Sequence, residues 1–255
     1  MATVALAALA SAPHQALATP SPIHEWTFDD GTARDVVGKL DGTLNGNVTI
    51  ANGQLVLDGS HANGGAYMST AFDTASLSTM TLVSWVSLGT LAQGGGSALS
   101  VVDGSQAFNS IDYAEATANQ WIAGSDYFHR TLANNGGAAV SDTAEQMLAI
   151  TYDASGAVQL YLDGSLYANG GAYAPFTMID PQYIVGLRHP DAAPSNGLLT
   201  GSIDMASVYD TALSAGDVAT LFSQGAECLP VPEPASLAIV AAGLGLLCLS
   251  RRRRA

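Results

Sequence analysis

The sequence predicts an all-β protein, a jelly-roll sandwich of two antiparallel sheets with one short helix at its C-terminal end. Short runs of β-branched and aromatic residues are separated by Asp-Gly and Asn-Gly turn signals, and helical patterns do not intervene. Seventeen of the 22 acidic residues are Asp, a residue that accepts turn conformations. The chain of 255 residues suits one such domain with a targeting segment at each end.

The first expected strand is the alternating run 24–28, which ends at the turn cluster 29–31. Further strands are expected where apolar or alternating runs stand between turn signals, at 48–50, 55–57, 80–88, 147–152, 158–162, 183–186 and 199–209. The runs 147–152 and 158–162 are joined by Ala154-Ser155-Gly156, which predicts a hairpin. The segment 108–130 has no clear alternation, so we expect it to be less regular.

One helix is expected after the last strand. Ser214 and Asp217 have the spacing of a capping box, in which each side chain bonds the backbone of the other residue. Val218, Leu221 and Phe222 form an apolar stripe along the helix, and Gly225 is a plausible terminator.

The C-terminus is organised differently from the rest of the chain. Val231, Pro232, Glu233 and Pro234 come at the end of a linker at 227–234, and an apolar run at 235–249 follows. Fifteen helical residues span about 22 Å, a marginal length for a membrane whose hydrocarbon core is about 30 Å thick. The basic residues Arg251, Arg252, Arg253 and Arg254 lie in a short tail at 250–255. We expect a transmembrane helix whose arginines stay cytoplasmic, with the preceding chain outside.

This tail strongly resembles the PEP-CTERM sorting signal, in which a short motif, a hydrophobic helix and a basic stop follow one another. The resemblance implies that an exosortase-type enzyme is a partner and processes the tail. A plain membrane anchor is the alternative, and the sequence does not show whether the mature protein keeps the tail.

The N-terminus is consistent with export. Val4–Ala10 is apolar, and Ala16-Leu17-Ala18 is a plausible cleavage site, so residues 1–18 are expected to be a signal peptide. The first basic residue is Arg34, so a positive region is missing, and we expect the true start to lie further upstream. The protein is expected to be exported and anchored at least transiently, in the cell envelope or outside it.

The domain is expected at residues 19–226, and the charge of the exported part, residues 19–230, excludes one class of partner. The chain has 22 acids and 8 bases; without Glu233 and the four terminal arginines, 21 acids and four bases remain, a net charge of −17. Such a surface repels nucleic acid, so we expect no binding to DNA or RNA. The two cysteines, Cys228 and Cys248, lie in the linker and the apolar run, so the domain has no internal disulfide.

The order of the expected strands resembles the LamG-like jelly roll of the concanavalin A-like lectin/glucanase superfamily. The residues that carry the resemblance are His24–Gly31, Asp41-Gly42, Leu55–Gly59 with Tyr67, Thr81–Val86, Ile150–Asp153, Val158–Gly164 and Gly201–Ser214. The resemblance implies a domain that binds a glycan, an exopolysaccharide or another extracellular partner. Some LamG-like domains bind calcium, which makes calcium a candidate cofactor whose ligands the sequence does not identify.

Catalytic residues are not apparent. Retaining hydrolysis of a glycoside needs two carboxyl groups about 5–5.5 Å apart, and none of Glu25, Glu115, Glu145 and Glu227 has another Glu within four residues. No acid-x-acid-x-acid strand and no Gly-x-Ser-x-Gly elbow occur in the domain. We therefore expect no enzyme activity.

Metal and anion sites are also hard to place. Asp29 and Asp30 are adjacent, but they are better explained as a turn at the end of a strand. The pairs His129-Arg130 and Arg188-His189 could flank an anionic ligand, although such residues more often offset nearby Asp charge. The repeated hexapeptide Ala-Asn-Gly-Gly-Ala-Tyr at 62–67 and 168–173 predicts similar turns, or else two similar loops that present Asn and Tyr to a ligand.

Trp121 is the candidate for contact with a sugar. Trp26 and Trp85 lie in regular strands and are expected in the core, whereas Trp121 lies in the less regular segment. Packing beneath a loop is the alternative for Trp121.

Three functions are compatible with the sequence. The preferred one is an exported, non-catalytic envelope module that binds glycan or another extracellular partner. The alternatives are a structural envelope or matrix protein with no discrete ligand, and a divergent glycan hydrolase.

Overall fold

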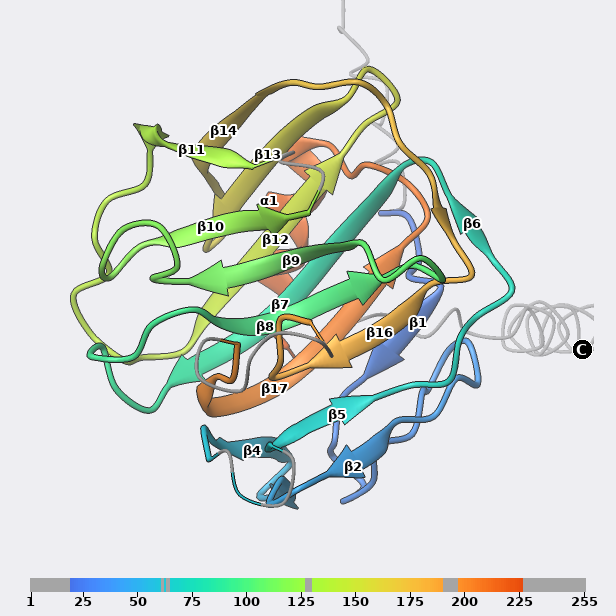
Figure 1. Cartoon of the computed structure of the whole chain (residues 1–255), viewed down its shortest axis with the longest axis vertical. Helices are drawn as coiled ribbons and strands as arrows, with labels where there is room; N and C mark the ends of the chain where they lie inside the picture. Colours follow the sequence, from blue (N-terminus) through green and yellow to red (C-terminus); the bar gives the residue numbers. More distant parts are fainter. Residues whose placement is uncertain (1–18, 61, 63–64, 127–129, 190–196, 227–255) are drawn as a thin grey trace, which may run out of the picture.

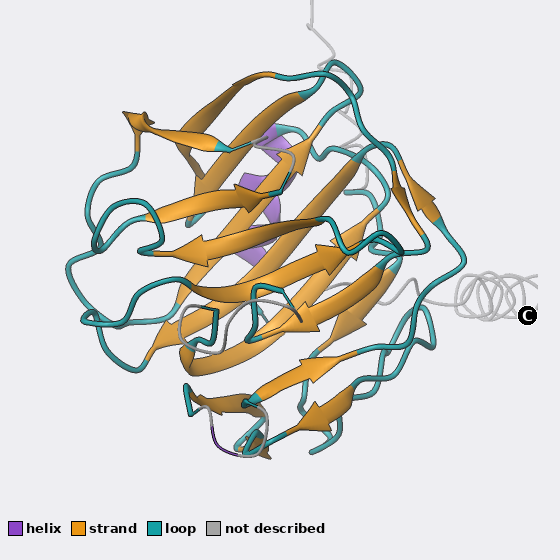
Figure 2. Ribbon diagram, in the orientation of Figure 1, coloured by secondary structure: helices purple, strands orange, loops and turns teal. Residues whose placement is uncertain are grey.

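The computed structural model describes residues 19–60, 62, 65–126, 130–189 and 197–226. These residues form two facing antiparallel β-sheets, with one helix against the outer face of the larger sheet (Figures 1 and 2). The predicted sandwich with one short helix is therefore confirmed. The expected signal peptide at 1–18, the sorting motif, the transmembrane run at 235–249 and the terminal arginines lie outside the described residues. Within the described part, no helix has the length and apolar character needed to cross a bilayer.

The larger sheet has nine strands in the described residues, in the order β11-β14-β13-β12-β7-β17-β4-β3, with β1 also pairing to β17. Their bounds are β1 His24–Trp26, β3 Thr49–Ala51, β4 Gln54–Asp58, β7 Met80–Leu88, β11 Thr131–Gly136, β12 Gln146–Tyr152, β13 Ala157–Leu162, β14 Ser165–Ala172 and β17 Thr200–Tyr209. The predicted hairpin is present as β12 and β13, in which Leu148 pairs with Leu162.

The smaller sheet has six described strands, in the order β10-β9-β8-β16-β5-β2. Their bounds are β2 Thr43–Asn45, β5 Tyr67–Ser69, β8 Gly96–Val102, β9 Phe108–Tyr113, β10 Trp121–Ser125 and β16 Gln182–Val185. A two-stranded ribbon of β6 (Ser76–Leu77) and β15 (Met178–Ile179) stands beside the two sheets. The expectation of an irregular segment at 108–130 is wrong, because β9 and β10 pair regularly there from Asn109 to Ser125.

The main core lies between the two sheets. It is built from inward-facing side chains of both sheets, among them Trp26, Leu82, Ile111, Tyr113 and Tyr183. Burying these large apolar side chains supplies the principal driving force for folding. Trp26 is fully buried there, as the sequence predicts.

Strand β7 is buried on both of its faces. Leu82 and Val86 face the main core, whereas Val83 and Trp85 belong to a second cluster beneath helix α1 (Ala215–Gln224). The ring of Trp85 stacks on Phe222 of α1 with centroids 5.9 Å apart. The helix therefore completes a second apolar layer on the outer face of the large sheet.

The ends of α1 follow the predicted signals. Ser214 accepts a hydrogen bond from the backbone of Asp217, whose side chain accepts one from the backbone of Ser214. The helix ends at Gly225, which has a φ of 80° and donates its N–H to the carbonyl of Phe222. These bonds satisfy backbone groups that a helix end leaves open.

Candidate functional site

The outer face of the small sheet carries a row of buried polar side chains. Along β9, Ile111 and Tyr113 face the main core, so Ser110 and Asp112 face the opposite side. Strand β8 matches this pattern, because Ser97 pairs with Asp112 and Ser100 pairs with Ser110. All four side chains are fully buried, so a polar layer lies beneath the surface here.

Two of the serines in this layer are fastened by hydrogen bonds. The hydroxyl groups of Ser97 and Ser100 lie 2.9 Å apart, and Ser100 donates to the carbonyl of Leu187 at 3.0 Å. Leu187 belongs to the segment that follows β16, so these bonds hold that segment against the sheet.

Asp112 is the least satisfied member of this layer. Its side chain is fully buried, and neither carboxyl oxygen makes a hydrogen bond of good geometry with the described residues, although the hydroxyl groups of Ser110 and Ser97 lie close by. Burial raises the pKa of Asp112 to about 7; the nearby Glu115 raises it further, whereas Arg188, Ser110 and Ser97 oppose the shift. The carboxyl group occupies the space above Gly124, where any side chain would collide with Oδ2 of Asp112.

Glu115 joins two arginines that are distant in the sequence. Its Oε1 lies 2.7 Å from Nη1 of Arg188 and 3.7 Å from Nη2 of Arg130. The Arg188 guanidinium also lies over the ring of Phe108, 6.0 Å from the centroid. Oε2 of Glu115 and Nε of Arg188 are buried without a hydrogen-bond partner in the described structure. The side chains of Glu115, Arg188 and Arg130 are 19%, 16% and 30% exposed, so solvent reaches each of them.

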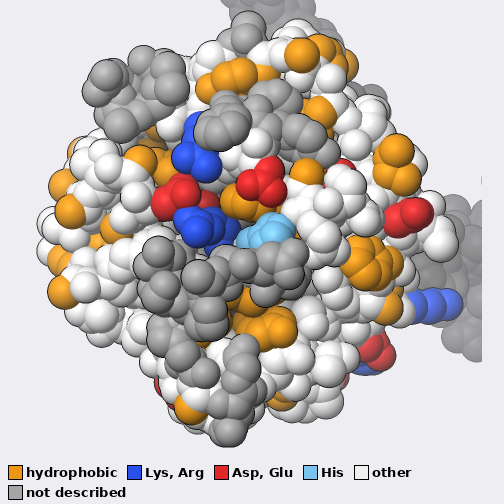
Figure 3. Space-filling model, viewed as in Figure 1, with side chains coloured by type: hydrophobic (Ala, Val, Ile, Leu, Met, Phe, Trp, Pro, Cys, Tyr) orange, Lys and Arg blue, Asp and Glu red, His pale blue; other side chains and the backbone are white. Residues whose placement is uncertain are grey.

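A surface hollow opens beside this cluster. It has a volume of about 430 Å³ and is lined by Gly94, Gly95, Ala114, Glu115 and Arg188; we call it the front hollow. In Figure 3, basic, acidic and histidine side chains gather near the centre of this face of the molecule. Among the described residues, the front hollow therefore combines backbone walls with one acceptor and one donor side chain.

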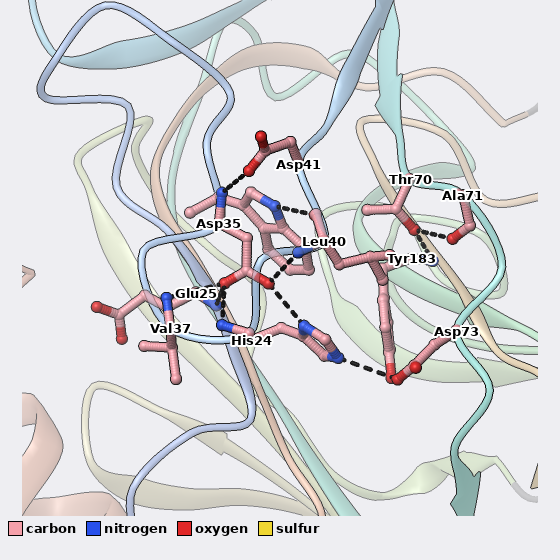
Figure 4. A network of polar contacts seen from close by, with 12 residues as sticks. His24, Glu25, Asp35, Val37, Leu40, Asp41, Thr70, Ala71, Asp73 and Tyr183 are labelled. Atoms are coloured by element: carbon pink, nitrogen blue, oxygen red, sulfur yellow. Dashed lines mark hydrogen bonds and ion pairs between the residues drawn. The ribbon is translucent and has the colours of Figure 1, made fainter.

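A second polar network lies in the interior around the first strand (Figure 4). Nδ1 of His24 lies 2.7 Å from Asp35, Nε2 lies 3.1 Å from Asp73, and the ring contacts Tyr183 at 4.9 Å between centroids. The side chain of Asp35 is fully buried and that of His24 is 7% exposed. This network fastens loops to β1.

Trp121 lies in a different environment from the one expected of a sugar-binding residue. It belongs to β10, is 1% exposed, and donates from Nε1 to Oε1 of Gln146 at 3.0 Å. Its ring meets Tyr113 edge-on, with centroids 5.0 Å apart. An enclosed indole offers no face for a sugar to stack on, and the alternative of a packing role agrees with this geometry.

The structure also describes the adjacent aspartates, the potential metal ligands and the repeated hexapeptide that the sequence singled out. Asp29 and Asp30 lie at a turn, where Asp30 accepts hydrogen bonds from the backbone and hydroxyl of Thr32. No group of three potential metal ligands occurs among the described residues. The two hexapeptide copies are not equivalent loops, because the first ends at β5 of the small sheet and the second lies largely in β14 of the large sheet.

The structure brings Arg130 and Arg188 together and adds Asp112 and Glu115. The criteria for paired carboxylates, two Glu within four residues or acids at alternate positions, do not include these two acids. The signal in the sequence is an Asp and a Glu three residues apart.

The comparisons with known proteins agree with this architecture. Residues 58–219 match the family model of the concanavalin A-like lectin/glucanases superfamily. The chain belongs to this superfamily. Residues 230–254 match the PEP-CTERM protein-sorting motif, which indicates export and sorting to the cell envelope and implies processing by an exosortase. No curated protein matches the chain in sequence.

Solved structures share the fold at low sequence identity. Domain 4 of AbnA, an extracellular arabinanase from Geobacillus stearothermophilus in complex with arabinotriose, is 19% identical with a TM-score of 0.62, and the match covers 78% of this chain and 97% of that domain. The Trypanosoma rangeli sialidase is 17% identical with a TM-score of 0.58, and the match covers 80% of this chain and 33% of the sialidase. The botulinum neurotoxin serotype G binding domain is 15% identical with a TM-score of 0.53, and the match covers 80% of this chain and 51% of that domain. The chain thus spans about a third of the sialidase and half of the toxin domain.

Proposed function

We propose that this protein is an exported, envelope-sorted module that binds a glycan without cleaving it, and that the glycan occupies the front hollow. The observation that carries the proposal is the side-by-side placement of Glu115 and Arg188 at the wall of the hollow, 2.7 Å apart and both partly exposed. A sugar hydroxyl donates and accepts at once, so a carboxylate beside a guanidinium offers it both partners. The volume of 430 Å³ lies within the range of about 300–1,000 Å³ that is usual for ligand sites.

The comparisons support a glycan as the ligand class. The arabinanase domain that this chain covers almost completely was determined with a bound arabinotriose. The superfamily itself takes its name from lectins and glucanases. These likenesses support a glycan as the class of ligand to be tested, and the geometry of the front hollow supports this hollow as the site to be tested.

The enclosure of Asp112 favours binding without catalysis. Hydrolysis of a glycosidic bond uses two carboxyl groups that both reach the substrate. Glu115 is the acid that lines the front hollow in the described structure, whereas the nearby Asp112 is fully buried. One accessible carboxyl group suffices for hydrogen bonding but supplies half of the usual catalytic pair.

The test is binding of the full-length chain, kept in a mild detergent, to an array of oligosaccharides, followed by calorimetric titration with the best of them. Each measurement is made with calcium and with a chelator. We expect saturable binding, a large loss in the double variant E115Q/R188Q, and retention in R34Q, which removes an exposed arginine elsewhere. Full binding by the double variant would place the ligand at another surface, and no binding by the wild type would favour a structural envelope role.

A divergent hydrolase is the second candidate, and one observation favours it. Burial raises the pKa of Asp112 to about 7, so this carboxyl group is partly protonated at neutral pH, as a general acid must be. Prolonged incubation with a bound oligosaccharide, followed by chromatography, tests it. Cleavage that is lost in both D112N and E115Q would replace the binding proposal with a hydrolytic one.

A further inference from the structure

Helix α1 and the front hollow lie on opposite sides of the sandwich. The helix packs on the outer face of the large sheet, where Trp85 stacks on Phe222. Glu115 and Arg188, which line the front hollow, follow strands β9 and β16 of the small sheet. In Figure 2 the helix is seen behind the strands, whereas the small sheet lies toward the viewer. The main core therefore separates the helix from the front hollow.

The described chain leaves the domain on the helix side. Ala226, the last described residue, packs against the apolar cluster that includes Trp85. Residues 227–234 follow as the linker to the apolar run at 235–249, which the sequence predicts to enter a bilayer. The segment that is expected to anchor the protein is therefore attached to the face that carries α1.

The linker is too short to turn the small sheet toward a membrane. Its eight residues reach at most about 29 Å when fully extended, and Pro230, Pro232 and Pro234 stiffen it. From β7 beneath the helix, the nearer side edge of the large sheet lies across β17, β4 and β3, about 14 Å away at about 4.8 Å per strand. The second sheet lies about 10 Å further, and the helix adds about 10 Å. A linker that passed around this edge would use its whole length before the front hollow met lipid.

Two exposed apolar side chains lie on the helix side. Phe222 and Leu166 are 39% and 50% exposed. Phe222 packs over Gly164, where an added Cβ would lie 2.9 Å from the Cβ of Phe222. Leu166 pairs with Tyr161, which belongs to the cluster beneath α1, so Leu166 points to the same outer face. We call Phe222 and Leu166 the helix-side patch.

The charge of α1 favours a neutral lipid surface over an anionic one. The helix contains no Lys or Arg and carries Asp217 in its first turn. The basic side chains that attract anionic headgroups are therefore missing from it. A small apolar contact is effective here because the tether keeps the patch at a high local concentration near the lipid.

We propose that, before its tail is processed, the protein stands on the bilayer with the helix-side patch against lipid and the front hollow facing away from the membrane. The partner of this surface is a neutral phospholipid bilayer. The inference goes beyond the proposed function, because the orientation does not depend on what the front hollow binds. It keeps the front hollow open to the extracellular space.

The experiment measures how strongly lipid quenches a fluorophore on each face. The full-length chain is reconstituted into phosphatidylcholine nanodiscs that contain a phospholipid with a nitroxide on its headgroup. Both native cysteines are removed by C228S and C248S, and bimane is attached to one new cysteine. We expect S223C on α1 to be quenched at least about threefold more strongly than G94C at the front hollow, because about 20 Å of protein separates the two labels.

The label positions and variants are matched. Ser223 is exposed, and a side chain at Gly94 would meet only the carbonyl of Ala114 at 3.7 Å. L166Q should lower the quenching at S223C at least about twofold, and F222Q/L166Q should lower it further, because the contact is apolar. I179Q is the control, since Ile179 is 57% exposed but lies on β15 of the small ribbon, and it should leave the quenching unchanged.

Each outcome has one meaning. Equal quenching of the two labels, or stronger quenching of G94C, overturns the orientation. Unchanged quenching at S223C in both L166Q and F222Q/L166Q overturns the helix-side patch as the lipid contact. A chain that does not incorporate into nanodiscs lacks the tether and overturns the inference as a whole.

The test remains usable if one variant folds poorly. Loss of the stack between Trp85 and Phe222 can unfold F222Q/L166Q, whereas Leu166 is half exposed and L166Q keeps that stack. The oligosaccharide array measures glycan binding separately. Failure of the orientation and failure of the proposed function are therefore distinguishable.

Discussion

Nδ1 of His24 lies 2.7 Å from Oδ2 of Asp35, and this contact ties the first strand to the segment that follows it. The same carboxylate accepts hydrogen bonds from backbone N–H groups on both sides, at 3.0 Å from Glu25 and 2.8 Å from Gly38 and Leu40. One buried side chain therefore organises a whole turn. Because β1 is held to the sheet by three residue pairs with β17, this support matters for its stability.

We predict that D35N destabilises the protein by about 2–4 kcal/mol, because the amide NH₂ group must face N–H donors that the carboxylate now satisfies. Urea unfolding followed by circular dichroism measures the change. D30N is the matched control, since Asp30 is exposed and bonds mainly within its own turn. An unfolding free energy for D35N equal to that of D30N would contradict the prediction.

Asp35 should also make the unfolding free energy depend on pH in the acidic range. Burial alone would raise the pKa of Asp35, but the hydrogen bonds from His24 and the backbone outweigh burial and hold its pKa well below the usual range. A depressed folded pKa contributes stability above the unfolded value of about 3.9, and this is lost as pH falls below it. Wild-type unfolding free energy should therefore fall below about pH 4, and D35N should show a shallower fall.

Glu25 should have the opposite effect, lowering the unfolding free energy as pH rises. Burial, and then the charge of Asp35, raise the pKa of Glu25 to about 7, and its Oε2 has no partner among the described residues. A raised folded pKa favours folding at low pH, and this contribution is lost as pH rises from about 4.5 to 7. We expect E25Q to exceed the wild type by about 1–3 kcal/mol at pH 8 and to show no gain at pH 4. The difference between the two urea-derived profiles isolates Glu25 from other titrating groups, and a gain that is independent of pH would contradict this assignment.

A side chain at Gly124 should disturb the buried polar side chains of β8 and β9 beneath the front hollow. A methyl group at this position would collide with the carboxyl group of Asp112 and with the hydroxyl of Ser110, and both side chains are fully buried. We expect G124A to lower the unfolding free energy by about 1–3 kcal/mol. G94A is the control, since its nearest contact would be the carbonyl of Ala114 at an ordinary 3.7 Å. Equal midpoints for the two variants in urea would show that the layer tolerates the change.

Substitution of Trp121 should lower the stability of the protein without weakening ligand binding. W121F removes the hydrogen bond to Gln146 and part of the packing against Tyr113, and we expect a cost of about 1–3 kcal/mol. At temperatures where the variant is folded, its affinity for the glycan found in the array should equal that of the wild type. If folded W121F bound the glycan more weakly than the wild type, Trp121 would be a ligand contact after all.

Features that depend on residues close together in the chain could be predicted from the sequence. Strands whose polar residues are buried by other strands could not. The capping box of Ser214 and Asp217 formed as expected because its partners lie three residues apart. Strand β9 was missed because Phe108 and Asn109 reverse the alternation of polar and apolar residues that 110–113 follows, so the alternating run is only four residues long. The polar side chains of β9 are buried by neighbouring strands and by the segment after β16, a situation that no local pattern shows.

The sequence by itself determined the sorting motif, the many short β-strands and the capped helix, because each depends on residues close together in the chain. Only the tertiary structure decided the front hollow. Glu115 and Arg188 are 73 positions apart, and they meet because β9, β8 and β16 are neighbours in the small sheet. That order of strands results from long-range pairing and from the shared core, so neither residue signals the other in the sequence.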